Sequence, residues 1–298
     1  MSSRLQAPVI GYTLGDQAGV GPELIARVLP QLPALAEYRP MGPALPCTPG
    51  QPTAQTAQAA LEHLERAAEA LRDGRIDALV TAPVCKENLQ RLGFPYPGQT
   101  EFFADRLGVM QRHAMCLSGA HLTVALCTTH VELAQVPTLL SAERIVEVGE
   151  LLCEFLRSIG HARPRIAVAG LNPHNGEGGA FGHQEQSIIS PAVATLRARL
   201  PHALVSGPCV PDVVYRDAAA GLYDGIVAPY HDQALIPLKL LDFHTAVNTT
   251  LGLPRLRVSP DHGTAFSLAG TGQAHAGSMR CAFELALRYV QPAIEGEP

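Results

Sequence analysis

The chain has 298 residues, 47% of them hydrophobic, and a formal net charge of −5. This length and apolar content indicate a packed globular protein with one large domain or two domains. Nonspecific nucleic-acid binding is not expected, because the chain lacks the basic excess that neutralises a phosphate backbone. A small anionic substrate held by a few local cations remains compatible with this charge.

The N-terminal stretch MSSRLQAPVIGYTLG has no long apolar signal core, and no segment of the sequence is apolar enough to span a membrane. The seven cysteines are scattered, odd in number and without a C-x-x-C pair. Such usage is typical of reduced thiols in the cytosol. We therefore expect a cytoplasmic protein without a membrane partner.

The first part of the chain predicts a strand over 9–13, the Gly-rich turn GDQAGVGPE and a helix over 24–29. Pro22 and Glu23 suit the start of that helix. The turn either receives a phosphate or cofactor or is simply a tight connection that needs glycine. The stretch 37–56 is expected to be a surface loop or linker, because its regularly spaced prolines exclude a regular helix or central strand.

A strong helix is predicted over 57–74, with His63 at its surface, and a buried strand over 76–84. The next helix covers 101–106 and follows Thr100. The Thr100 hydroxyl would cap this helix, or an anion would bind at the same N-terminus. Local sequence alone favours the cap.

Three apolar runs each lead into a polar segment that carries a histidine. The run 166–169 precedes His174, HLTVALCTTH ends in His130, and YDGIVAPYHD leads to His231 with Asp232 beside it. Ligands bind beyond the carboxyl ends of strands in open α/β sheets, so the three imidazoles are placed to converge on one cation, with zinc favoured. The alternative is three hydrogen-bonded loop histidines, since no local metal-binding spacing joins them.

The rest of the chain continues the alternation of strands and helices. An amphipathic helix is expected over 141–159, and another begins with Ser190 as N-cap and Pro191 at the first helical position. The alternation indicates an α/β fold with mainly parallel strands.

Polar residues interrupt the apolar segments after His231. They are Lys239, Asn248 and Arg257. Buried cations are costly unless paired, so at least one of the two basic residues is expected to face an anion. The alternative is that both extend their charged ends to the surface.

Taken in order, the motifs resemble one family. They are GDQAGVGPE, TAPVCKE, PGQTEFFADRLG, TTH, GLNPHNGEGG, YHDQALIPLK and VNTTLGLPRLRVSPDHGTAFSLAG. The ordered set, from about residue 11 to residue 289, resembles the 4-hydroxythreonine-4-phosphate dehydrogenase family of pyridoxal phosphate biosynthesis. Its HGTAFSLAG segment is also similar to the cofactor-loop motif of isocitrate and isopropylmalate dehydrogenases.

The resemblance implies a two-domain isocitrate/isopropylmalate dehydrogenase-like α/β architecture, with mainly parallel sheets flanked by helices and the active site in the interdomain cleft. The first domain would comprise residues 1–128 plus 252–298 and carry the cofactor loop. The second, residues 129–251, would carry the metal ligands and the dimer interface. The resemblance further implies a homodimer in which both subunits contribute to each active site.

The resemblance also assigns the site residues. The metal ligands would be His130, His174 and His231, binding zinc, with Mg²⁺ or Co²⁺ as alternatives. The substrate contacts would be Gln99, Thr100, Lys239, Asn248 and Arg257. NAD or NADP would bind at His262, Gly263, Thr264 and Ala265. The catalytic residues would be Lys239 and Asp232, the latter as an orienter of His231 or a proton relay.

The implied activity is metal-dependent, NAD(P)-linked oxidation and decarboxylation of 4-hydroxythreonine 4-phosphate to 3-amino-2-oxopropyl phosphate. The chain departs from the family pattern at Gln99, where histidine is usual, and at Gln17, where proline is common. The proline-rich stretch also replaces a longer family segment.

Two other functions are compatible with the sequence. Gln99 favours a catabolic paralogue that oxidises 4-phosphothreonate, 4-phosphoerythronate or a carboxylated cyclic dihydrodiol. A noncatalytic metal- or phosphate-binding protein is the other alternative, and the intact HGTAFSLAG segment argues against it.

Overall fold

The computed structural model describes residues 7–291, and the chain divides into two compact units. Unit 1 is Met1–Gln111 with Val247–Gln291, and unit 2 is Arg112–Ala246 with Pro292–Pro298. Residues 1–6 and 292–298, which the sequence analysis assigned to the first domain, lie outside the described part. The division between these units falls before residues 112 and 247, and the sequence analysis placed it before residues 129 and 252.

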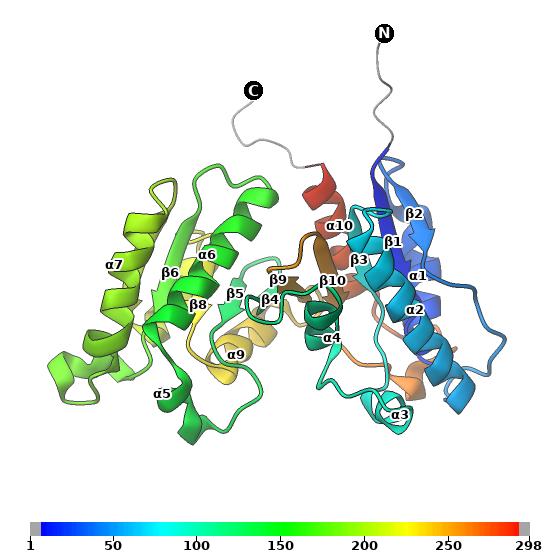
Figure 1. Ribbon diagram of the computed structural model, residues 1–298, viewed down its shortest axis with the longest axis horizontal. Helices are drawn as coiled ribbons and strands as arrows, with labels where there is room; N and C mark the ends of the chain where they lie inside the picture. Colours follow the sequence, from blue (N-terminus) through cyan, green and yellow to red (C-terminus); the bar gives the residue numbers. More distant parts are fainter. Residues whose placement is uncertain (1–6, 292–298) are drawn as a thin grey trace, which may run out of the picture. The chain divides into compact units, whose positions relative to one another are not determined.

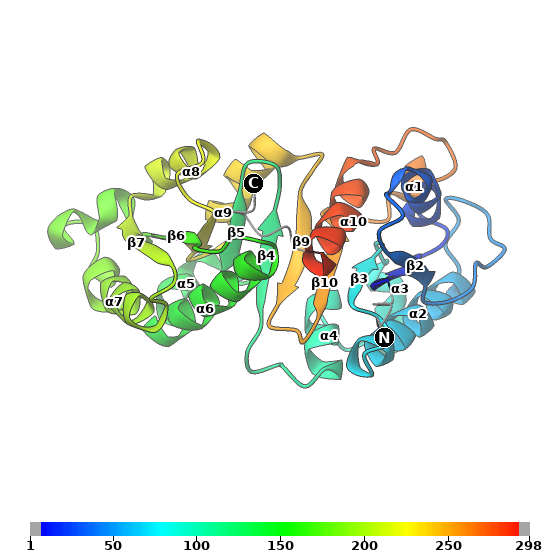
Figure 2. The same ribbon diagram turned by 90° about the horizontal axis from the view of Figure 1, so that it is seen from above.

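Unit 1 contains a five-stranded portion of sheet in the order β2-β1-β3-β10-β9. All neighbours are parallel except β9, which runs antiparallel to β10. Helices α2 and α10 cover its opposite faces (Figure 2). The strands are β1 (Val9–Thr13), β2 (Glu37–Pro40), β3 (Ala78–Thr81), β9 (Val247–Leu251) and β10 (Leu256–Pro260), and the helices are α1 (Gly21–Val28), α2 (Ala54–Arg72), α3 (Lys86–Arg91), α4 (Gln99–Arg106) and α10 (Gly277–Val290).

Unit 2 contains strands in the order β4-β5-β8-β6-β7. The β4–β5 hairpin is antiparallel, and the other pairs are parallel. Helix α6 packs on one face, and α8 and α9 lie on the other (Figures 1 and 2). The strands are β4 (Ala114–Ser118), β5 (Thr123–Leu126), β6 (Arg165–Ala169), β7 (Leu204–Cys209) and β8 (Gly225–Ala228), and the helices are α5 (Val136–Leu139), α6 (Ala142–Ser158), α7 (Ser190–Arg199), α8 (Pro211–Ala219) and α9 (His231–Asp242).

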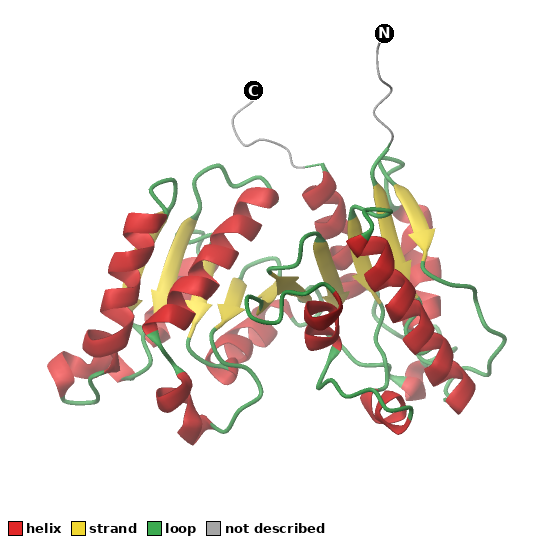
Figure 3. Cartoon of the chain, in the orientation of Figure 1, coloured by secondary structure: helices red, strands yellow, loops and turns green. Residues whose placement is uncertain are grey.

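The observed architecture confirms the predicted α/β class with mainly parallel strands (Figure 3). Each unit has its own apolar core. In unit 1 the core contains Leu64 and Leu71 of α2, Leu79 of β3, and the α4 residues Phe102 and Phe103. In unit 2 the core lies between the β5, β6 and β8 side chains and the inner faces of α8 and α9. Sheet and helices therefore bury their apolar surfaces against each other.

The proline-rich stretch begins with a strand, which the sequence analysis did not predict. Strand β2 pairs in parallel with β1 at the end of the strand order, and Pro40 is its last residue. Proline is tolerated at an edge strand because the outer side of that strand needs no donor. The remaining residues of the stretch up to Thr53 form the expected irregular loop.

Two predicted helix starts have different outcomes. Ser141 is the N-cap of α6, and its side chain accepts a hydrogen bond from the Arg144 N–H at 3.1 Å. The prediction for Ser190 is wrong: Ile189 is the N-cap of α7 and no side chain caps that helix. The π-helical turn Glu185–Ile189 runs directly into α7. The backbone is therefore already helical before Ser190, which lies within a continuous helical segment and does not start it.

The predicted surface position of His63 is also wrong, because this residue is only 2% exposed. It lies on the face of α2 that turns toward the sheet, together with Ala60, Leu64 and Ala67. Its ring packs against the backbone of Gly42, where an added Cβ would lie 2.1 Å from two ring atoms. Only glycine leaves room for the imidazole at this contact.

All seven cysteines are free thiols, as their sequence pattern predicts. Within residues 7–291, none of the helices combines the length and apolar character needed to cross a membrane.

Candidate active site

The three strands that precede the candidate metal ligands are neighbours in unit 2. Strand β8 pairs in parallel with both β5 and β6, so their carboxyl ends lie at the same edge. His130 follows β5 in a loop, His174 follows β6 in the short turn Pro173–Gly179, and His231 is the first residue of α9, after β8. This edge is where ligands bind in α/β sheets.

His130 and His231 lie close together. Their ring centroids are 5.5 Å apart, and both rings line a cavity of about 300 Å³ together with Tyr230 and Asp232. Asp232 Oδ1 lies 2.7 Å from His231 Nδ1. A carboxylate on one ring nitrogen orients the imidazole and makes the other nitrogen a better ligand. The pair therefore presents Nε2 of His231 as the atom suited to a metal.

The loop that carries His174 has an uncommon backbone. Residues 174–178 all have positive φ angles, between 43° and 76°, and form a short left-handed turn. Asn175 anchors the turn by donating from Nδ2 to the Pro208 carbonyl at 2.8 Å. Left-handed non-glycine residues cost energy, so such anchoring is needed to hold them.

Glu185 holds the start of the same loop. This carboxylate is 2% exposed and accepts the backbone N–H groups of Leu171 and Asn172 at 2.8 and 2.7 Å, and the Asn172 side-chain amide at 3.0 Å. Burial alone would raise its pKa, but these hydrogen bonds outweigh burial and lower the pKa. The Glu185 side chain is therefore held as a carboxylate that accepts hydrogen bonds from the start of the loop.

The structure brings two of the three histidines together. The ring of His174 instead lies beside that of Phe181, with the two centroids 6.3 Å apart. Among the described residues, no group of three or more His, Cys, Asp and Glu side chains is arranged to hold a metal ion. The imidazoles of His130 and His231, with Asp232 orienting the second, have the donor chemistry of a divalent-metal site, but two ligands are fewer than such sites usually draw from protein.

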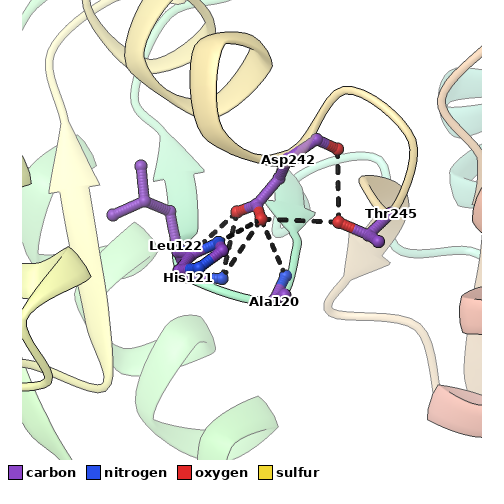
Figure 4. A network of polar contacts seen from close by, with 5 residues as sticks. All are labelled: Ala120, His121, Leu122, Asp242 and Thr245. Atoms are coloured by element: carbon purple, nitrogen blue, oxygen red, sulfur yellow. Dashed lines mark hydrogen bonds and ion pairs between the residues drawn. The ribbon is translucent and has the colours of Figure 1, made fainter.

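The helix that begins with His231 is anchored at its other end by Asp242 (Figure 4). The buried Asp242 carboxylate accepts N–H groups from Ala120, His121 and Leu122 in the β4–β5 turn, at 3.1–3.3 Å, and lies 2.7 Å from His121 Nδ1. An added Cβ at Gly119 would lie 2.3 Å from this carboxylate. The contacts fix α9, and with it His231, to the β4–β5 hairpin.

The two basic residues considered from the sequence differ in burial. Lys239 is exposed on α9, so the argument from burial does not apply to it. Arg257 of β10 is 2% exposed, and within residues 7–291 no carboxylate lies at ion-pair distance from it. Burial lowers the pKa of its guanidinium to about 9. A buried cation that has no carboxylate partner favours the binding of an anion.

Neutral side chains surround Arg257 in unit 1. Its Nε and Nη2 donate to Thr81 Oγ1 at 3.0 and 2.6 Å, and Nη2 also donates to Gln99 Oε1 at 2.9 Å. Nη1 lies 3.4 Å from Thr250 Oγ1, and the Phe103 ring centroid is 5.6 Å from Cζ. Sequence reasoning missed Thr81 and Thr250, because only strand register places them beside Arg257.

Arg257 meets the N-terminus of α4 through Gln99, the first residue of that helix. The N-cap is Gly98, and no side chain caps the helix, so the expectation that Thr100 caps it is wrong. Thr100 already lies inside the first turn, with its hydroxyl 3.4 Å from that of Thr250. The uncapped helix start and the buried guanidinium together favour an oxyanion.

Asn248 provides another buried polar atom in this unit. Its Oδ1 is buried and has no hydrogen-bond partner among the described atoms. An orphaned acceptor of this kind is costly unless a ligand or water satisfies it. In unit 1 the structure thus connects Gln99 and Arg257 directly, with Thr100 attached through Thr250.

The candidate cofactor residues lie in unit 1 beside the Gly-rich turn. The Val20 N–H donates to the Thr264 carbonyl at 2.9 Å, and an added Cβ at Gly19 would lie 2.7 Å from the same oxygen. His262 Nε2 is buried without a partner, and Ala265 has a left-handed φ of 42°. These features fit a bound group that supplies a hydrogen-bond partner to His262.

Gln17 and the proline-rich loop, the two other departures from the family pattern, are in contact with each other. Gln17 donates from Nε2 to the Pro43 carbonyl at 3.3 Å and accepts the Leu45 N–H at 2.7 Å. Its amide therefore pins the proline-rich loop to the turn after β1. Glutamine has both a donor and an acceptor for this task, whereas proline has neither.

Fold and site together define an α/β protein with candidate ligand-binding side chains grouped at strand ends and at a helix N-terminus. The chain belongs to the family described as pyridoxal phosphate biosynthetic protein PdxA, whose family model matches residues 26–286.

Named relatives agree with this assignment. A 4-hydroxythreonine-4-phosphate dehydrogenase from Desulfosudis oleivorans is 41% identical over an alignment that covers 94% of this chain and 95% of the relative. A D-threonate 4-phosphate dehydrogenase from Pectobacterium atrosepticum is 45% identical, over 75% of this chain and 68% of the relative. These two relatives are therefore dehydrogenases that are named for different phosphorylated substrates.

Solved structures show the same fold. The crystal structure of a 4-hydroxythreonine-4-phosphate dehydrogenase from Klebsiella pneumoniae matches with a TM-score of 0.81 and 38% identity, covering 95% of this chain and 100% of that chain. An isocitrate dehydrogenase from Methylococcus capsulatus matches with a TM-score of 0.53 and 12% identity, over 96% of this chain and 86% of that chain, which is a likeness of fold alone.

Proposed function

We propose that this protein oxidises 4-hydroxythreonine 4-phosphate with NAD or NADP, and that the oxidised product loses carbon dioxide to give 3-amino-2-oxopropyl phosphate. The observation that carries the proposal is Arg257, a buried cation without a carboxylate partner at the uncapped start of α4. A phosphorylated amino acid supplies the anion that this site lacks. Relatives named for this substrate support the choice.

The substrate contacts follow from the side chains present. Arg257 would hold the phosphate or carboxylate by charge-assisted hydrogen bonding, with Gln99, Thr100 and Asn248 offering neutral polar atoms. Lys239, exposed on α9, would add a second cation that holds the phosphate or carboxylate. Orienting the reacting carbon in this way lowers the entropic part of the barrier.

His130 and His231 would hold a divalent metal, with zinc favoured over Mg²⁺ or Co²⁺ because imidazole is the ligand. The metal would supply a Lewis acid at the hydroxyl that is oxidised. Asp232 holds His231 Nδ1 at 2.7 Å and so would keep the imidazole oriented throughout the reaction.

The remaining ligand is proposed to be His174 from a second copy of the chain, because one chain groups only His130 and His231. Helix α9, which begins with His231, leaves Ile236, Leu240 and Phe243 between 67% and 82% exposed. Large apolar side chains this exposed on one helix and the turn after it favour burial against a partner. A homodimer with a shared active site accounts for both observations.

The nicotinamide cofactor is proposed to bind at His262, Gly263, Thr264 and Ala265. The buried His262 Nε2 needs a partner, and the neighbouring Gly263 has open space around its Cα. The cofactor would accept the hydride, and the protein residues would bind and orient it.

A second candidate substrate is D-threonate 4-phosphate. The specific observation in its favour is Gln99, an uncharged amide whose oxygen is already bonded to Arg257. Such a side chain adds no charge to the anion site. The 45% identical Pectobacterium relative is named for this substrate.

The test is a rate measurement with the purified dimer, zinc and either NAD or NADP, following absorbance of the reduced nicotinamide. Each phosphorylated substrate is supplied separately, and His231→Ala serves as the control. Higher kcat/KM with 4-hydroxythreonine 4-phosphate supports the proposal, and higher kcat/KM with D-threonate 4-phosphate establishes the second candidate. Metal and cofactor binding without turnover of either substrate would contradict both.

A further inference from the structure

The guanidinium of Arg257 is held mainly along one edge. It carries five N–H groups in total. Nε and Nη2 donate to Thr81 Oγ1, Nη2 donates again to Gln99 Oε1, and Nη1 reaches Thr250 Oγ1 at 3.4 Å. The short bonds all lie on the Nε/Nη2 edge. One N–H of Nη1 remains without an acceptor among the described residues.

Strand register explains why Thr81 is the residue on that edge. In the parallel β3–β10 pair, Arg257 lies beside Leu79, so Thr81, two residues further along β3, points to the same face. In the antiparallel β9–β10 pair, Thr250 lies directly opposite Arg257. We call Thr81, Gln99, Thr250 and Phe103 the Arg257 cage.

The cage is neutral, so it fixes the orientation of Arg257 without neutralising its charge. Three members offer uncharged oxygens, and Phe103 offers the face of its ring, 5.6 Å from Cζ. Glu101 is the acidic residue that acts on Arg257 electrostatically, and it lies beyond ion-pair distance. The positive charge therefore remains for a ligand.

We propose that Thr81 is a positioning residue, which holds Nε and Nη2 of Arg257 so that Nη1 points at the bound oxyanion. The ligand then receives one N–H and the full charge of Arg257 rather than a two-pronged contact. The inference deepens the proposed function, on which it rests for the identity of the substrate. Its anion-binding part is measurable without that substrate.

Removing the Thr81 hydroxyl should release the guanidinium. Thr81 is fully buried, so valine in its place would leave Nε without an acceptor and Nη2 with Gln99 alone. Unsatisfied buried donors are costly, and Arg257 would turn toward other acceptors. Nη1 would then leave the direction in which it meets the anion.

The experiment compares Thr81→Val, Thr81→Ser and the wild-type dimer, with inorganic phosphate as the probe in calorimetric titrations. Thr81→Val should raise the phosphate Kd and the substrate KM about tenfold, with kcat within about twofold, a loss typical of one charge-assisted hydrogen bond. Thr81→Ser keeps the oxygen and should restore both constants to near wild-type values.

Thr13→Val is the matched control. Thr13 is paired with Thr81 in the β1–β3 ladder and is equally buried, but its hydroxyl has no partner among the described residues. This variant should leave the phosphate Kd unchanged. Circular dichroism and Tm confirm that each variant folds, so that a change of Kd reports on the site.

Three results would overturn the proposal. They are a folded Thr81→Val with unchanged Kd and KM, a Thr81→Ser as defective as the valine variant, or a wild-type protein that does not bind phosphate. Phosphate binding that depends on Thr81, without turnover of either substrate, would instead reject the proposed function and retain the role of Thr81.

Discussion

At the residue scale, His63 illustrates how burial converts one side chain into a pH-sensitive element of stability. It is 2% exposed, and its Nδ1 has no partner among the described atoms. Burial, assisted by the nearby Arg66, lowers the pKa of this imidazole below 6.5. The folded protein therefore resists protonation that the unfolded chain accepts.

We predict that His63 costs stability in acid. Folding lowers the pKa of His63, so the neutral imidazole is fully compatible with the folded state above about pH 6.5, the pKa in the unfolded chain. The stability present there is lost as the pH falls toward the pKa of the folded protein. His63→Leu removes the titration and should give a shallower fall in Tm between about pH 7 and pH 5. Parallel pH dependences of Tm in the two proteins would contradict this prediction.

At the element scale, helix α9 carries a candidate metal ligand at its first residue and a structural anchor at its last. Its first residue is His231, and its last residue, Asp242, is tied to the turn between β4 and β5 (Figure 4). The helix also contains Pro237, which removes one backbone donor from its interior. The contacts of Asp242 at the C-terminal end therefore contribute more to holding this helix in place.

We predict that Asp242→Asn lowers the free energy of unfolding by about 1–3 kcal/mol, because an amide replaces one acceptor oxygen and leaves a buried N–H group unsatisfied. Urea unfolding measures the loss. His121→Ala is the control: the side chain of His121 is 53% exposed, so its removal should cost less than the Asp242 substitution. Equal losses would show that the imidazole, rather than the turn amides, carries the anchor.

At the scale of the whole molecule, one chain brings together two of the three histidines that are proposed to bind a metal. His130 and His231 are together, while His174 stands on a separate, left-handed turn. The exposed apolar residues of α9 and the turn after it lie on the element that starts at this site. The proposed sharing of one site between two copies of the chain would account for both facts.

We predict that His174→Ala and His231→Ala, each inactive alone, regain activity when co-expressed. A mixed dimer would contain one intact site, with His130 and His231 from one chain and His174 from the other. Once it is separated from the two inactive homodimers, the mixed dimer should show about half of wild-type activity, because one of its two sites is intact. Activity assays after purification through two different tags measure it, and the absence of recovery in a verified mixed dimer would show that each chain supplies its own ligands.

The local sequence determined the features that depend on short-range physics. Apolar runs and caps such as Ser141 predicted strands and helices, their alternation predicted the parallel α/β class, and the strand-end positions predicted where the three histidines emerge. The ordered motifs identified the family. Each of these depends on residues a few positions apart, for which the backbone geometry is known in advance.

Only the tertiary structure decided which distant residues meet. Thr81 and Arg257 are 176 positions apart in the chain and are joined by the register of β3 and β10. His63 is buried because α2 turns that face to the sheet, and Ser190 loses its cap role to a π-helical turn. Register and packing depend on the summed contacts of many residues, which no local pattern records.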